Sequence, residues 1–156
     1  MRQIALMIAT TALFLSPTAA QDPTKIPPQI QKHMESMVGS WTFEGRQGDR
    51  KFFGQETVRL TNNKTALLQE GYFDLGGGEK EHYVILSGWD GSAKTVFVRG
   101  FTTDGISWTG EWKKLKDGKW LGTASGGRAE FEVKKNTMRY EDAGDGTPWI
   151  SEFTRK

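Results

Sequence analysis

The chain has 156 residues, of which 21 are Lys or Arg, 19 are Asp or Glu and none is Cys. This near-neutral balance argues against nucleic acid as a partner and against a role at an anionic membrane surface, because both need a basic patch. The absence of Cys excludes disulfides, cysteine nucleophiles and thiolate metal ligands.

The first twenty residues have the pattern of a cleaved signal peptide. Arg2 supplies the positive start, residues 4–15 are an apolar run, and small residues precede a cleavage site before Gln21. A retained membrane anchor is the alternative, but the run is short for a bilayer and Pro17 ends it. We therefore expect bacterial export, removal of residues 1–20, no stable membrane anchor after cleavage, and a periplasmic or secreted protein.

A polar, Pro-containing leader follows at residues 21–27 and is expected to be extended. A short amphipathic helix is predicted over residues 28–38, because Pro suits the first helical turn and Ile30, Met34 and Met37 recur at helical spacing. His33 lies between the apolar positions and is expected to be exposed to solvent. Gly39 is the predicted C-cap of this helix.

Turn signals then recur at intervals of 9 to 15 residues from Asn62 onward. Gly, Asn and Asp tolerate the positive φ of hairpin turns, and the segments between them alternate as half-buried strands do. Strands are predicted over residues 40–46, 51–60, 65–73, 81–89, 94–102, 106–113, 119–124, 128–134, 137–142 and 148–155. The even spacing favours one all-β domain over residues 28–156, an antiparallel up-and-down barrel of about 8–10 strands with one short N-terminal helix. A two-sheet sandwich is the alternative.

Two short segments resemble a known group of barrels. Gly39-Ser40-Trp41, after a short helix and at the start of the first strand, resembles the opening of calycins: lipocalins, fatty-acid-binding proteins and nitrobindin-like barrels. Residues 87–94 resemble a strand and turn of bacterial lipocalin-like domains of unknown function. The resemblance spans residues 36–155. In lipocalins a basic side chain from a late strand covers the Trp, which implies that Arg155 lies over Trp41 as a structural pair.

Residues suited to metal or covalent chemistry are scarce. The chain has two histidines, His33 and His82, so neither a zinc site nor the late-strand haem ligand of nitrobindin-like barrels is expected. No Ser lies in a Gly-x-Ser-x-Gly elbow, and no phosphate-binding glycine loop precedes a helix. We therefore assign no catalytic residue, no metal and no cofactor.

Three strand faces combine apolar residues with a charge, at Glu56, Glu70 and Arg99. If these faces point inward, the charges are buried and Arg99 must contact a carboxylate. A shift of one residue would place them all on the surface. Trp108 and Trp112 share another face, either as core or as a stacking wall. The candidate ligand-binding residues are Glu56, Glu70, Tyr72, Tyr83, Phe97, Arg99, Phe101, Trp108 and Trp112.

The sequence leaves three functions open. The first is a barrel that binds a small apolar or amphipathic molecule without covalent chemistry. The second is a structural or interaction domain with a filled barrel. The third is a small enzyme in which buried Glu56 or Glu70 acts as acid or base, since burial moves a carboxyl pKa toward neutrality. Neither the identity of a ligand nor the oligomeric state follows from the residues.

Overall fold

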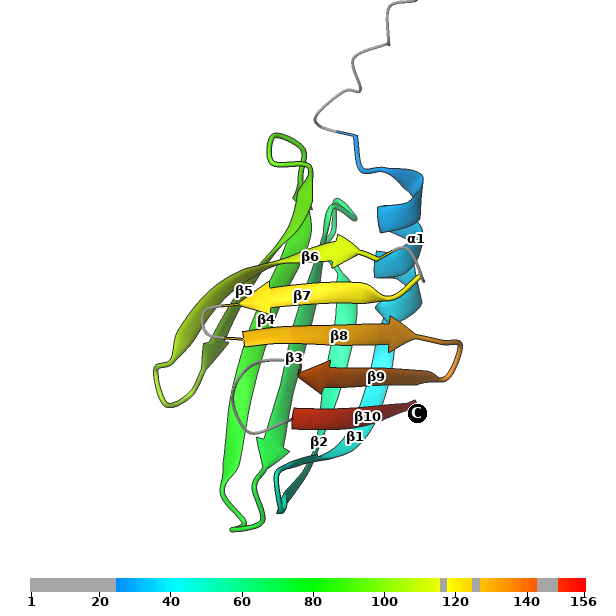
Figure 1. Cartoon of the computed structure of the whole chain (residues 1–156). Helices are drawn as coiled ribbons and strands as arrows, with labels where there is room; N and C mark the ends of the chain where they lie inside the picture. The colour runs from blue at the N-terminus through cyan, green and yellow to red at the C-terminus, as the bar shows by residue number, and fades with distance from the viewer. Residues whose placement is uncertain (1–24, 116–117, 125–126, 143–148) are drawn as a thin grey trace, which may run out of the picture.

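The computed structural model describes residues 25–115, 118–124, 127–142 and 149–156, and these form a closed antiparallel barrel with one short helix (Figure 1). The expected signal peptide and residues 21–24 of the leader lie outside the described residues. The elements are α1 (Pro28–Met37), β1 (Gly39–Gln47), β2 (Arg50–Leu60), β3 (Ala66–Asp74), β4 (Lys80–Asp90), β5 (Thr95–Thr102), β6 (Ser107–Lys114), β7 (Trp120–Ala124), β8 (Gly127–Val133), β9 (Thr137–Asp142) and β10 (Trp149–Arg155). In the described part of the chain, no helix is long and apolar enough to cross a membrane.

Closure of the barrel joins its first and last strands. β1 pairs with β10 from Trp41 opposite Arg155 to Gln47 opposite Trp149, and every other strand pairs with its neighbour in sequence. The predicted up-and-down barrel is therefore confirmed, and the sandwich alternative is wrong. Among the strands of the described residues, closure leaves none with an unpaired edge.

The β5–β6 turn, within the described residues, forms at the predicted Asp104-Gly105 pair. At the β5–β6 turn, Gly105 has a φ of 87°, a conformation that side chains disfavour. The backbone N–H of Gly105 donates to the Thr102 carbonyl at 3.1 Å, and the Asp104 carboxylate accepts from the Ile106 N–H at 3.2 Å. An Asp-Gly pair thus supplies both the side-chain acceptor and the backbone freedom that this turn needs.

Helix α1 lies across one end of the barrel and buries a broader face than the sequence suggested. Ile30, Met34 and Met37 are buried as expected, but His33 is buried too, with its ring stacked on Trp120 at 3.9 Å between centroids. The expectation that His33 is exposed is wrong. Positions 30, 33, 34 and 37 follow the spacing of a single helix face, so docking on the barrel covers all four.

The helix ends one residue earlier than predicted, and its C-cap is Val38. The predicted cap, Gly39, instead begins β1 with a φ of 150°. A Cβ at Gly39 would collide with Nη1 of Arg155, so glycine at this position makes room for the guanidinium.

Trp41 and Arg155 close the barrel end beneath the helix. Trp41 is fully buried, and its indole N–H donates to the Met37 carbonyl at 2.9 Å. The Arg155 guanidinium lies 4.2 Å from the centre of the Trp41 ring and donates to the carbonyls of Ser36 and Val38. One arginine therefore covers the indole and also caps the last turn of α1. The cation–π contact with the indole is worth about 0.5 to 2 kcal/mol.

Candidate functional site

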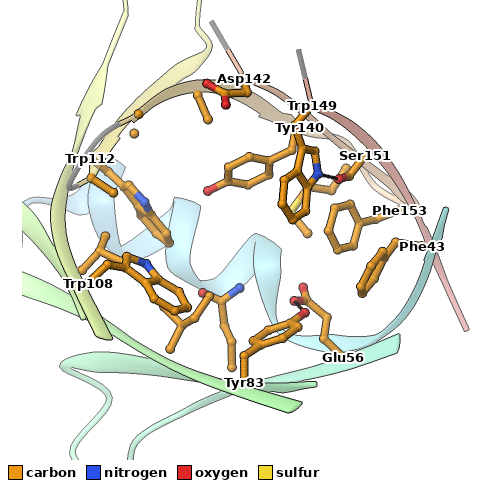
Figure 2. Close-up of a pocket in the computed structure, with 18 of the residues that line it drawn as sticks. Phe43, Glu56, Tyr83, Trp108, Trp112, Tyr140, Asp142, Trp149, Ser151 and Phe153 are labelled. Carbon is orange, nitrogen blue, oxygen red and sulfur yellow. Dashed lines mark hydrogen bonds between the residues drawn. The ribbon is translucent and has the colours of Figure 1, made fainter. Parts of the chain in front are cut away.

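The barrel encloses a cavity of about 330 Å³ between its strands. Figure 2 shows the cavity with α1 lying behind it, so the helix closes one end of the barrel. Ala124, Gly127 and Asp142, at the ends of β7, β8 and β9, border the opposite end. Eight aromatic side chains line the wall, and they are Phe43, Phe73, Tyr83, Trp108, Trp112, Tyr140, Trp149 and Phe153.

Glu56, on β2, is the acidic group inside this aromatic wall. Its side chain is 5% exposed, and the Tyr83 hydroxyl donates to Oε2 at 2.8 Å. The other oxygen, Oε1, is buried without a hydrogen-bond partner. Burial raises the pKa of Glu56 to about 7, although the hydrogen bond from Tyr83, and after it the nearby Gln69 amide, partly oppose that rise. A carboxyl group that changes charge near neutral pH therefore faces the cavity.

A glycine brings Tyr83 and Glu56 together. In the register of the sheet, Glu56 on β2 lies opposite Gly71 on β3, and Gly71 lies opposite Tyr83 on β4. A Cβ at Gly71 would lie 2.8 Å from Cζ of Tyr83 and 2.8 Å from Cβ of Glu56. The missing side chain lets the phenol ring cross β3 and reach a carboxylate two strands away.

Two further polar groups lie on the opposite wall. The Tyr140 hydroxyl points toward the middle of the cavity, and the Trp149 indole N–H donates to the Ser151 hydroxyl (Figure 2). Burial and the nearby Glu56 charge both raise the pKa of Tyr140, so its phenol stays protonated near neutral pH. Tyr140 can therefore donate a hydrogen bond to a bound molecule.

The other charged residues that line the cavity, Arg128 and Asp142, lie at its mouth. Arg128 is exposed and Asp142 is half-buried. Among residues 25–115, 118–124, 127–142 and 149–156, no group of three or more His, Asp or Glu is placed to hold a metal ion.

The structure separates the candidate residues into two sets. Glu56, Tyr83, Trp108 and Trp112 all line the cavity. Of the two registers left open, β3 and β5 adopt the one that turns these faces outward, because burial on both strands alternates in the opposite phase. The candidates that lie on the outer side of the barrel wall are Glu70, Tyr72, Phe97, Arg99 and Phe101.

Each of the outward charges has a surface environment. Glu70 accepts a hydrogen bond from Arg59 at 3.2 Å, with both side chains about half exposed. Arg99 is exposed, so it forms no interior network with Glu56. Phe97 packs on the outer side against Gly88, where a Cβ would lie 2.9 Å from the Phe97 ring.

We expect Glu70→Gln to change the free energy of unfolding by less than about 1 kcal/mol, because exposed ion pairs contribute little. Urea denaturation of the variant and the wild type would measure the difference. A loss of several kcal/mol would show that the Arg59–Glu70 pair is shielded from water.

Several residues of the cavity wall were not among the candidates. Gln69 is buried on β3 and lines the cavity together with Glu56. Tyr140 and Trp149 supply rings from β9 and β10, and Ser151 is a buried residue of β10. Apolar and polar residues alternate over residues 137–142, and this pattern indicates an inward position for Tyr140, which lies on the same strand face as Met138. Gln69 had a weaker signal, since its face of β3 is about as apolar as the other.

Comparison with protein-family models finds no matching family, and comparison with curated proteins finds no match. Among solved structures, the chain is similar to a designed protein whose title describes the de novo design of a fluorescence-activating beta barrel, with a TM-score of 0.50 and 14% sequence identity. The alignment covers 79% of this chain and 96% of the designed one. At this identity the likeness shows the fold alone.

Proposed function

We propose that this protein binds a small, largely apolar molecule inside the barrel, beside Glu56, without forming a covalent bond to it. The observation that carries the proposal is a cavity of about 330 Å³ with aromatic walls and one buried carboxyl oxygen lacking a partner. Ligand pockets of this kind are mostly apolar, with a few polar groups that orient the ligand. The cavity disfavours the filled-barrel alternative, and the designed barrel of similar fold, described as fluorescence-activating, is compatible with the proposal.

The proposal includes a lipocalin-like, exported protein. The Gly39-Ser40-Trp41 opening and the Arg155 guanidinium over Trp41 support the calycin resemblance. The proposal that the protein is exported rests on the sequence pattern of residues 1–20 alone. N-terminal sequencing of the protein from its own host would test it, with a mature start near Gln21 as the expected result and an intact Met1 as the contrary one.

Fluorescence of N-phenyl-1-naphthylamine, a neutral apolar dye, tests binding in the cavity. Gly122 lines the cavity on β7, and a Cβ there would lie at contact distance, 3.4 Å, from the Trp112 ring. Gly122→Phe should therefore fill the cavity and abolish saturable dye binding. Arg99→Leu, on the outer surface, should bind the dye as the wild type does.

Circular dichroism of each variant would establish that it remains folded. Native mass spectrometry of the protein from its host should also show a retained small molecule that Gly122→Phe lacks. Equal dye binding by wild type and folded Gly122→Phe would place the dye elsewhere and contradict the proposal.

A second candidate function is acid–base catalysis by Glu56. It is favoured by the carboxyl group with a pKa of about 7 that lies 2.8 Å from the Tyr83 hydroxyl inside the cavity. Glu70, the other carboxylate considered, is excluded from this role in the cavity by its outward position. Recovery of the natural ligand chemically unchanged after prolonged incubation would support binding alone, whereas conversion lost in Glu56→Gln would support catalysis.

A further inference from the structure

The charged side chains inside the cavity favour a positively charged ligand. Inside the mouth, the described lining residues include one ionisable acid, Glu56, and no Lys or Arg side chain. Arg128 lies at the rim, and Arg99 lies on the outer surface. The nearest titratable groups facing Glu56 are the phenols of Tyr83 on β4 and Tyr140 on β9. A ligand carboxylate would therefore lie close to the Glu56 carboxyl group, and no basic side chain inside the barrel would neutralise it.

The geometry of Glu56 fits a ligand that donates hydrogen bonds. Tyr83 occupies Oε2, while Oε1 has no partner and the side chain is almost fully buried. A buried carboxylate is costly unless a positive group pairs with it. No salt bridge within the described residues supplies that group to Glu56.

The aromatic wall favours the same ligand chemistry. Phe43, Tyr140, Trp149 and Phe153 line the cavity together with Glu56 and Tyr83 (Figure 2). The faces of aromatic rings carry partial negative charge and attract ammonium groups, most strongly where water is excluded. Flat rings of a ligand can also stack against such walls.

We infer that the cavity binds an organic cation, an amine whose ammonium group pairs with Oε1 of Glu56 while its hydrocarbon or aromatic body lies against the rings. This inference rests on the proposed function, because it assigns a chemical class to the ligand of the same cavity. Burial raises the pKa of Glu56 to about 7, so the unliganded site holds a proton at mildly acidic pH. The cation takes the place of that proton when it binds.

Three probes of one shape but different charge test this inference: tryptamine, its alcohol tryptophol, and indole-3-propionate. Isothermal titration calorimetry near pH 8 should give tryptamine an affinity about tenfold or more above tryptophol, from the ion pair and cation–π contacts. Indole-3-propionate should bind most weakly. Glu56→Gln should lower the tryptamine affinity by about tenfold and leave tryptophol nearly unchanged. Glu70→Gln, an exposed carboxylate, is the matched control and should behave as the wild type.

A second measurement needs no variant. Near pH 6, tryptamine binding to the wild type should release a proton, seen as an enthalpy that changes with the ionisation enthalpy of the buffer, whereas tryptophol binding should not. Equal affinities for tryptamine and tryptophol, or dye binding without tryptamine binding, would overturn the cation inference and leave the proposed function standing. If neither the dye nor any indole binds in the cavity, the proposed function fails as well.

Discussion

Replacing Trp41 by alanine should lower the free energy of unfolding by about 3 to 5 kcal/mol, the usual cost of truncating a large buried aromatic side chain. Trp41 is fully buried, and its indole N–H satisfies the Met37 carbonyl at the end of α1. Its ring also supports the Arg155 guanidinium. Removal therefore leaves a cavity, an unpaired carbonyl and an arginine without its partner at once.

Urea denaturation followed by circular dichroism would measure this loss. Trp41→Phe keeps a ring but loses the N–H, so its cost should fall below that of Trp41→Ala. Phe101→Ala is a control for loss of an aromatic ring, because Phe101 is 56% exposed, and it should cost less than about 1 kcal/mol. If Trp41→Ala and Phe101→Ala had similar midpoints, Trp41 would not stabilise the barrel end as described.

Stability should also depend on pH through two buried groups that act in opposite directions. Burial raises the pKa of Glu56 from 4.5 to about 7, so its contribution is fully present below pH 4.5 and is lost as pH rises through 7. Burial and the Lys114 charge lower the pKa of His33 from 6.5 to about 4, so stability is lost as pH falls from 6.5 through 4. Each change amounts to about 3 kcal/mol. Their combined contribution should be nearly constant between about pH 4.5 and 6.5.

Single substitutions separate the two contributions. The stability of Glu56→Gln relative to wild type should rise by about 3 kcal/mol between pH 4.5 and pH 8, because the variant carries no charge to bury. His33→Phe keeps a ring against Trp120, and its stability relative to wild type should rise as pH falls from 6.5 to 4. Glu70→Gln is the exposed control. If the difference in free energy of unfolding between variant and wild type stayed constant across pH for both variants, neither group would be buried in solution as it is here.

The fold was predictable because its signals are local. Each tight turn needs residues such as Asp104 and Gly105, and each strand needs alternation, so strand number and order follow from short segments of sequence. Closure followed from the absence of long connections. The burial of His33 is also encoded locally, in the helical spacing that it shares with Ile30, Met34 and Met37, but a polar ring beside apolar positions predicts exposure to solvent.

The cavity wall was less predictable because it depends on register between strands. On β2 one face is clearly apolar and carries Glu56 into the interior, whereas the two faces of β3 differ little in hydrophobicity. On β5 the bulky Phe97 covers Gly88 from outside, while the smaller Val96 and Val98 face inward. Contact between Glu56 and Tyr83 needed the alignment of three strands across Gly71, which no single segment encodes.

The bond between Arg155 and the end of α1 also bears on the order of events when the chain is made. Arg155 and the Val38 carbonyl it binds are 117 residues apart, and β1 receives its second partner only from β10. Contacts so distant in sequence form late, after the segments between them have been synthesised. Until residues 149–155 arrive, β1 keeps an open edge and Trp41 lacks its cover. The barrel therefore stays open between β1 and the end of the growing sheet until β10 has been synthesised.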